Sequence, residues 1–374
     1  MQKLRFLLLV LAAGTFFSAH AQFTVTGTIL DSSSREPLGA ASVFCQNTTL
    51  GTTTNKQGEF SLNLKSGGYD LIISYTGYKT QTIRVSTDNN KMEILMVKED
   101  KSLGEVVLKN SYEVTDGLAK YGDFFLQYFI GATPNAARCT IVNPEVLKFY
   151  FYKRTNRLKV LAAEPVKIAN NALGYNLQYQ LDSFVYYYNT NGSIYRGYCL
   201  YTEMDGSDSM KTVWAKARKQ AYEGSKLHFM RSCYDSTLIQ DGWIVDLLDE
   251  KDDKKFDKIS NIYDTAYYNV YTNTVSVMGA DSIMREVASG PPEVEIYFPR
   301  KISITYTKKR PEPEYLKKMG LSRNVQFLIS YIDLRDAISI LENGYYYDQK
   351  NWVNQGYWSW KNLADQLPYD YSPE

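Results

Sequence analysis

The stretch Phe23-Thr24-Val25-Thr26-Gly27-Thr28-Ile29, close to the start of this 374-residue chain, decides how its first part folds. Apolar residues or Gly occupy the odd positions, and Thr occupies the even ones. Successive side chains of a strand point to opposite faces, so this alternation predicts a strand with one buried face.

Further short runs downstream are rich in apolar, β-branched or aromatic residues, and turn-forming residues separate them. The runs lie at residues 41–45, 60–64, 69–75 and 82–85, with turns at 31–34, 55–58, 66–68 and 88–90. Several short strands at this spacing are typical of a sandwich or barrel. We therefore expect an antiparallel β-sandwich over residues 22–108.

Four motifs in this stretch resemble the carboxypeptidase-regulatory-like domain. They are GTILD at 27–31, EPLGAASV at 36–43, TTTNKQGEF at 52–60 and SYTGYKT at 74–80. The resemblance implies a transthyretin-like β-sandwich of the kind found in front of TonB-dependent outer-membrane receptors of Gram-negative bacteria. It implies a folding or docking module and no catalytic residues. Asn55 stands where the family usually has Asp, so we expect the turn to be kept without that charge.

Residues 1–21 have the pattern of a secretory signal peptide. Lys3 and Arg5 precede an apolar run at 6–13, and Ala19-His20-Ala21 forms a small-x-small cleavage site. The apolar run is shorter than the about 20 residues that a membrane-spanning helix needs. We predict cleavage after Ala21 and a mature chain without a transmembrane segment, either periplasmic or associated with the outer membrane.

The charge balance argues against a nucleic-acid partner. The chain has 42 basic and 41 acidic residues, and loss of the signal peptide leaves 40 basic residues against 41 acidic ones. A protein that binds the phosphate backbone normally shows a clear basic excess or stripe. We interpret the short basic clusters at 308–310 and 317–318 as solvated loops.

Residues 109–374 are expected to form a second, β-rich domain of unknown function with a pair of helices. Strand-like runs lie at 147–152, 158–163, 175–188, 193–204, 293–298, 301–307, 324–332 and 337–347. The turn-forming residues 189–192 are expected to close a hairpin between 175–188 and 193–204. The segments 293–298 and 301–307 are expected to pair, and the charge run 249–257 to be a solvated loop or helix end. Residues 210–223 have helical spacing, Gly224 ends that helix, and Ser225 can cap a second one.

This second region also resembles a set of uncharacterised secreted proteins that carry the same front domain. The matching positions of its first motif are Phe125, Phe129, Gly131, Thr133, Asn135 and Ala136. The resemblance implies no known activity.

Few residues suit catalysis. His228 is the only histidine of the predicted mature chain, so a nucleophilic mechanism through Ser225 or Cys233 would have to use it as the base. A zinc site needs several His or Cys ligands at short spacing, and no phosphate-binding Gly motif occurs. We therefore predict no catalytic residues, metal ligands or cofactor.

Two alternatives stay open. Acidic residues next to Trp243 could supply a carboxylate pair, which leaves a secreted hydrolase of glycans or peptides as the rival function. These acidic residues are Asp241, Asp246, Asp249 and Glu250. Cys139, Cys199 and Cys233 could form a disulfide in an oxidising compartment, or could be buried free thiols like Cys45.

Aromatic residues are concentrated near the C-terminus. Aromatic side chains on strands are usually core, but exposed rings would form a binding surface. We predict such a surface at Tyr345, Trp352, Trp358 and Trp360. The chain is accordingly expected to be a non-catalytic binding or envelope-assembly protein, with an envelope protein or a glycan as its ligand.

The segment between Met96 and Tyr112 is expected to join the two domains, because its pattern becomes polar and irregular. Limited proteolysis of the mature chain should cut this joint before either body, since exposed linkers are the preferred cleavage sites. First fragments that arise inside residues 25–85 would contradict the assignment.

Overall fold

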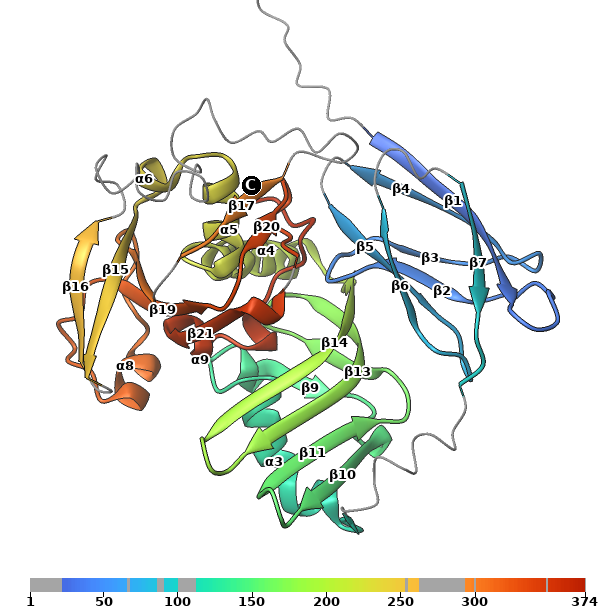
Figure 1. Cartoon of the computed structure of the whole chain (residues 1–374), viewed down its shortest axis with the longest axis horizontal. Helices are drawn as coiled ribbons and strands as arrows, with labels where there is room; N and C mark the ends of the chain where they lie inside the picture. The colour runs from blue at the N-terminus through green and yellow to red at the C-terminus, as the bar shows by residue number, and fades with distance from the viewer. Residues whose placement is uncertain are drawn as a thin grey trace, which may run out of the picture.

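The computed structural model describes residues 22–65, 68–85, 91–99, 112–252, 255–261, 293–298, 301–347 and 349–373. The predicted signal peptide and residues 100–111 of the predicted joint lie outside these ranges. The described chain is mainly β, with several antiparallel sheets and few helices, which confirms the expected fold class (Figure 1).

The N-terminal part is a sandwich of two sheets. One has the strand order β4-β1-β7 and the other β3-β2-β5-β6. The strands are β1 (Gln22–Asp31), β2 (Ser42–Cys45), β3 (Gly51–Thr53), β4 (Glu59–Lys65), β5 (Tyr69–Ser74), β6 (Gln81–Val85) and β7 (Lys91–Met96). The buried positions of β1 are Val25, Gly27, Ile29 and Asp31, so the predicted alternation is confirmed. The sandwich is not purely antiparallel, because β7 returns to this sheet from the opposite one and runs parallel to β1.

The predicted turn at Asn55 is present. The Asn55 Oδ1 atom accepts hydrogen bonds from the backbone N–H groups of Gln57 and Glu59, each at 2.9 Å. Gly58 follows with φ of +74°, and a Cβ there would lie 2.5 Å from the carbonyl oxygen of Ile29. A neutral amide oxygen therefore forms this turn without the charge of an Asp.

The second region begins with helix α3 (Gly117–Phe129), which packs on a seven-stranded sheet. The strands of this sheet are β8 (Tyr112–Glu113), β9 (Cys139–Ile141), β10 (Leu147–Tyr152), β11 (Arg157–Ala162), β12 (Val166–Asn170), β13 (Tyr175–Tyr187) and β14 (Gly192–Glu203). Phe125 and Phe129 of α3 are fully buried against this sheet. The predicted β13–β14 hairpin is confirmed, with Asn191 at a positive φ of 50° in its turn.

A five-stranded sheet, in the order β16-β15-β18-β19-β21, and a two-stranded sheet form the rest. Their strands are β15 (Trp243–Asp252), β16 (Lys255–Asn261), β17 (Val294–Ile296), β18 (Ile302–Tyr306), β19 (Leu328–Leu334), β20 (Ile338–Ile340) and β21 (Trp352–Gly356).

Two predictions about these strands are wrong. The described residues of the charge run, 249–252 and 255–257, lie in the paired strands β15 and β16 instead of a solvated loop or helix end, because β15 pairs with β18 over Trp243–Leu247 and continues as a strand into the charged residues. The segments 293–298 and 301–307 do not pair with each other. β17 pairs with β20, whereas β18 pairs with β15 and β19.

The predicted helical pair is present as α4 (Asp208–Tyr222) and α5 (Lys226–Tyr234). The Ser225 hydroxyl accepts a hydrogen bond from the His228 backbone N–H at 3.1 Å, which confirms its role as the N-cap of α5. Ser207 caps α4 through the Met210 N–H at the longer distance of 3.4 Å.

All four cysteines are free thiols. Cys45, Cys199 and Cys233 are buried, and burial raises the pKa of Cys139 to about 12. The structure therefore favours the second alternative, buried thiols without a disulfide.

Replacing Ser225 by Ala should lower the free energy of unfolding by on the order of 1 kcal/mol, because one N–H at the start of α5 loses its acceptor. Ser207→Ala, on the more exposed α4, is the matched control and should cost less. Chemical denaturation measures both variants. Covalent labelling of Ser225 in the folded protein by a serine-directed probe would contradict the capping role.

Candidate functional site

The predicted aromatic surface does not exist, because all four of its residues are buried. Tyr345 is 4% exposed, Trp352 6%, Trp358 5% and Trp360 4%. This prediction is wrong, since none of the four leaves a ring face accessible to a ligand. They serve packing, which was the alternative interpretation of the pattern.

The tertiary contacts of these side chains explain their burial. The Trp358 ring lies 5.5 Å from Phe229 and 6.1 Å from Trp243, and its Nε1–H donates to the Gly224 carbonyl at 2.8 Å. Tyr345 lies in a different cluster, and its hydroxyl donates to Asp70 of the sandwich at 2.6 Å. These residues therefore connect elements that are distant in sequence.

The contacts and the burial of His228 are those of a structural residue. Its Nδ1 atom accepts from the Gly224 N–H at 3.3 Å, and its Nε2 atom is 4.0 Å from the Asp241 carboxylate, beyond hydrogen-bond distance. Burial lowers its pKa to about 4, an effect that Asp241 only partly offsets. The Ser225 hydroxyl faces the backbone of His228 rather than its ring, and the buried thiol of Cys233 has a raised pKa. No nucleophile–base pair forms among these three residues.

The carboxylates near Trp243 do not present a catalytic pair. Asp241 accepts hydrogen bonds from Ser232 at 2.7 Å and from Thr237 at 2.5 Å. Asp246 is only 4% exposed. The side chains of Asp249 and Glu250 lie outside the described residues. The local sequence placed these acids near one another, but in the structure the described ones have internal roles.

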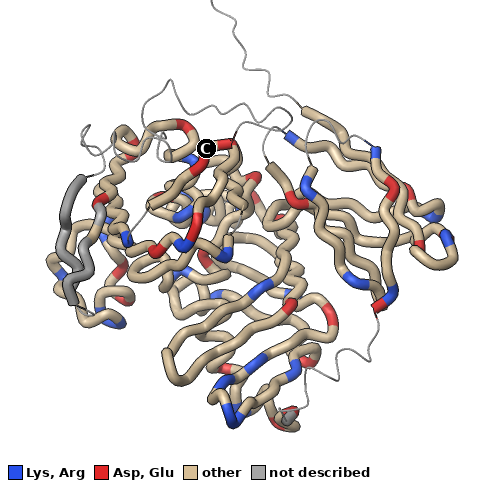
Figure 2. Tube along the Cα trace, in the orientation of Figure 1, with Lys and Arg blue, Asp and Glu red and all other residues tan. Residues whose placement is uncertain are grey.

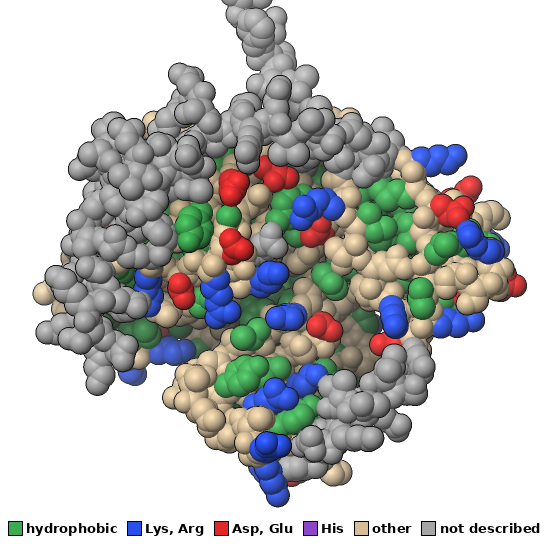
Figure 3. All heavy atoms as spheres, in the orientation of Figure 1, with side chains coloured by type: hydrophobic (Ala, Val, Ile, Leu, Met, Phe, Trp, Pro, Cys, Tyr) green, Lys and Arg blue, Asp and Glu red, His purple; other side chains and the backbone are tan. Residues whose placement is uncertain are grey.

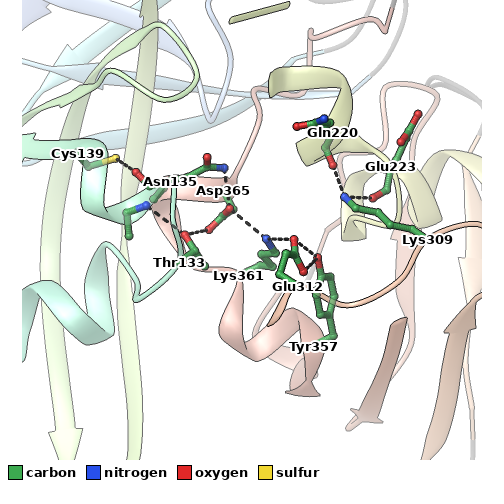
Figure 4. A network of polar contacts seen from close by, with 12 residues as sticks. Thr133, Asn135, Cys139, Gln220, Glu223, Lys309, Glu312, Tyr357, Lys361 and Asp365 are labelled. Atoms are coloured by element: carbon green, nitrogen blue, oxygen red, sulfur yellow. Dashed lines mark hydrogen bonds and ion pairs between the residues drawn. The ribbon is translucent and has the colours of Figure 1, made fainter. Parts of the chain in front are cut away.

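A polar network missed by the sequence analysis lies where three segments meet (Figure 4). The Lys361 ammonium is 2.9 Å from Glu312 Oε1 and 3.3 Å from Asp365 Oδ1. Tyr357 donates from its hydroxyl to Glu312 at 2.9 Å. This arrangement pairs two carboxylates with one cation, and a neutral hydroxyl adds a hydrogen bond to one of them.

The same network reaches the beginning of the second region. Asp365 is 6% exposed and accepts from the Thr133 hydroxyl at 2.7 Å and from the Asn135 amide at 2.9 Å (Figure 4). Thr133 and Asn135 belong to the motif that resembles uncharacterised secreted proteins. Their side chains hold the C-terminal segment in place, which gives this part of the motif a structural role.

The protonation states in this network do not suit acid–base chemistry. Burial alone would raise the pKa of Glu312, but Lys361 and Tyr357 hold it below the usual value. Burial and the neighbouring Glu312 raise the pKa of Tyr357 strongly. A general acid at neutral pH needs a carboxyl group with a raised pKa, and Glu312 has the opposite. Among the residues that the structure describes, no group of three or more His, Cys, Asp or Glu side chains could hold a metal ion.

Backbone hydrogen bonds join the sandwich to the second region. Asn47 N–H donates to the Cys199 carbonyl at 2.8 Å, and Tyr201 N–H donates to the Thr48 carbonyl at 2.9 Å. Thr48 and Leu200 form a parallel β-bridge, so the turn between β2 and β3 pairs with part of the β14 edge. We call residues 47–49 and 199–201 the edge pairing.

Further contacts surround the edge pairing. Tyr369 N–H donates to the Asn47 carbonyl at 2.8 Å, and Thr49 N–H donates to the Asp370 carboxylate at 2.9 Å. The Arg84 guanidinium stacks 3.2 Å from the centre of the Tyr347 ring. The sandwich is therefore held by β14, by the C-terminal tail and by residues 343–347. Figure 1 shows the sandwich beside these elements.

The pH dependence of stability should report the burial of His228. An unfolded histidine has a pKa of about 6.5, and the folded value is about 4. Between these values only the unfolded state binds the proton, so the free energy of unfolding should rise with pH through this window. Lowering the pH from about 6.5 to about 4 should cost on the order of 2 kcal/mol at this site.

His228→Gln should remove that contribution, so the difference in unfolding free energy between wild type and variant should change across the window. Taking the difference cancels the carboxylates that titrate in both proteins. Curves that stay parallel between pH 4 and 7 would contradict a neutral, buried His228.

Comparisons with known proteins match the first part of the chain. Residues 25–108 match the model of the CarboxypepD_reg-like domain family. The TonB-dependent receptor SusC of Bacteroides thetaiotaomicron is 36% identical over 104 residues, which cover 27% of this chain and 10% of the receptor. A TonB-dependent receptor of Formosa agariphila is 32% identical over 102 residues, with the same coverage.

Solved structures give weaker likenesses. The C-terminal domain of a shaft pilin from Lactobacillus rhamnosus GG is 15% identical, covers 21% of this chain and 99% of the pilin domain, and has a TM-score of 0.18. A DUF3823 family protein from Bacteroides ovatus is 10% identical, covers 49% of this chain and 96% of that chain, and also has a TM-score of 0.18.

The chain spans about a tenth of the length of the curated relatives it matches. The family model matches the N-terminal region of this chain. The family model, these relatives and the observed sandwich agree on this region. Residues 25–108 are a CarboxypepD_reg-like domain, related to the N-terminal regions of TonB-dependent receptors.

Proposed function

We propose that this chain is an exported, non-catalytic binding or assembly protein of the Gram-negative cell envelope. The observation that carries the proposal is the edge pairing, which attaches a receptor-type front domain to a second β-rich region. An envelope location is supported by the TonB-dependent receptors that share the front domain. It is also supported by the signal-peptide pattern of residues 1–21.

The contacts around the edge pairing support a scaffold role. Backbone hydrogen bonds at 2.8 and 2.9 Å on both sides of Thr48 fix the register of the sandwich on β14. The Tyr345 hydroxyl and the Asn343 amide add bonds to Asp70 and to the Gly68 carbonyl, at 2.6 and 3.0 Å. Two parts held in this way present their outer surfaces in one orientation, which reduces the entropy lost when a partner binds.

The buried titratable groups also support binding over catalysis. Lys361 forms ion pairs with both Glu312 and Asp365, and burial keeps His228 uncharged at neutral pH. Lys and Arg residues are interspersed with Asp and Glu residues along the Cα trace (Figure 2), which fits an envelope protein or a glycan better than a nucleic acid as the ligand. None of the helices in the described part of the chain is both long and apolar enough to span a bilayer.

One observation favours the rival function of a secreted hydrolase that uses carboxylates on glycans or peptides. Partial desolvation and the nearby Glu342 raise the pKa of Asp235, an exposed residue at the C-terminal end of α5. A raised pKa is what a general acid requires. Among the described carboxyl groups, Asp235 is the one whose pKa is raised, so we choose it for a test of the rival function.

The test expresses the full chain in a Gram-negative host and determines its N-terminal processing and its location. We expect mass spectrometry to find a mature N-terminus at Gln22 and fractionation to place the protein in the envelope, because signal peptidase cleaves after a small-x-small site. A chain that lacks residues 2–21 is the control and should stay in the cytoplasm. An unprocessed, cytoplasmic wild-type protein would contradict the proposed location.

The second measurement tests catalysis. The purified mature chain and its Asp235→Asn variant should show the same background rates on panels of glycans and peptides. Turnover by the wild type that falls at least tenfold in Asp235→Asn, with folding unchanged, would establish the hydrolase instead.

A further inference from the structure

Helix α8 (Pro313–Met319) is anchored on one side, by aromatic side chains of the short helix α9 (Tyr357–Trp360) that follows β21. Tyr315 and Leu316 are buried, and the Tyr315 ring lies 5.2 Å from Tyr357 and 5.3 Å from Trp360. The following residues lead to β19 and are almost all exposed. We call residues 317–327 the α8 tip.

The backbone of the α8 tip is held in a defined shape. Gly320 adopts φ of 63°, and its N–H donates to the Lys317 carbonyl at 3.3 Å. The Leu321 N–H donates to the Leu316 carbonyl at 2.9 Å, which completes a Schellman motif at the helix end. Val325 N–H closes a turn onto Ser322 at 3.2 Å. Side chains on this segment are therefore presented without a large ordering cost.

Large apolar side chains of the tip are exposed to solvent. Met319 is 47% exposed, Leu321 44% and Phe327 43%, although Leu328 next to them is buried. Single exposed apolar side chains are normal on soluble proteins. In the α8 tip, three exposed apolar side chains lie within nine residues of a well-ordered segment. The packing of this fold does not require their exposure.

Cations are interspersed with these apolar side chains. Lys317, Lys318 and Arg323 are exposed, and Glu314 is the one acidic residue between positions 313 and 327. Figure 3 shows basic and hydrophobic side chains together at the lower left, at the place of α8 in Figure 1. Lys317 and Lys318 also interact favourably with the C-terminal end of α8. That role does not account for Arg323 or for the apolar exposure.

We propose that the α8 tip docks on an anionic lipid surface. Segments that bind the membrane interface combine exposed apolar side chains, which enter the headgroup region, with Lys and Arg, which contact anionic headgroups. The tip has both in a preorganised loop. A protein partner would also accept an apolar surface, but the charge of the tip complements a lipid surface that carries many negative groups. The role in the cell rests on the proposed envelope location, whereas binding to vesicles does not.

The test is flotation of the purified mature chain with vesicles. We expect binding to vesicles that contain phosphatidylglycerol, weaker binding at high salt, and little binding to vesicles of phosphatidylcholine alone. The triple change Lys317→Gln, Lys318→Gln and Arg323→Gln should weaken binding to anionic vesicles about a hundredfold, since each cation contributes about a factor of five. The triple change Met319→Ser, Leu321→Ser and Phe327→Ser should weaken it on both types of vesicle.

Met210→Ser with Val213→Ser is the matched control. These two side chains of α4 are 47% and 54% exposed, and their replacement should leave vesicle binding unchanged. The charge variant alters only exposed side chains, so it tests the proposal even where the apolar variant fails to fold. Absence of wild-type binding, or binding by both tip variants that equals that of the wild type, would overturn the proposal.

Two further outcomes are distinguishable. Sedimentation that shows a dimer dissociated by the tip variants would make a second copy of this chain the occupant and overturn the lipid proposal. Vesicle binding by a chain that is never exported would contradict the proposed envelope function but would still support lipid binding by the α8 tip.

Discussion

The edge pairing is the constraint on which the arrangement of the whole molecule depends. β14 lies outside the main path of its sheet and pairs with β13 on one side. Its other side would expose unpaired N–H and C=O groups, which attract foreign strands. The turn at Asn47 and Thr48 satisfies the groups of Cys199 and Tyr201 and at the same time fixes where the sandwich sits. The same hydrogen bonds therefore protect the edge of β14 and attach the sandwich to it.

The C-terminal segment completes this arrangement from the opposite end of the chain. Asp365 bonds to Thr133 and Asn135, and Asp370 bonds to Thr49 of the sandwich. The six residues 365–370 therefore connect the start of the second region with the first domain. These polar contacts are internal to the fold, so they contribute to its stability.

Local signals in the sequence predicted local structure well. Asn55 with Gly58, the turn at 189–192 and the cap at Ser225 each depend on residues within a few positions of one another, and all three are present. Their physical cause is contained in the short segment itself. The domain family of residues 25–108 followed from motifs of the same local kind.

What the sequence could not predict depends on distant partners. Trp358 is buried because Phe229 and Trp243 lie above it, and the charged end of β15 is a strand because β18 extends the ladder. Aromatic density alone does not distinguish a core from a binding surface, since both use the same rings. The structure reverses the expectation: the dense C-terminal aromatic block is interior, while the sparse apolar side chains of the α8 tip remain outside. A binding function must use side chains that the fold leaves accessible, so in this chain exposure, and not aromatic content, determines where a partner can bind.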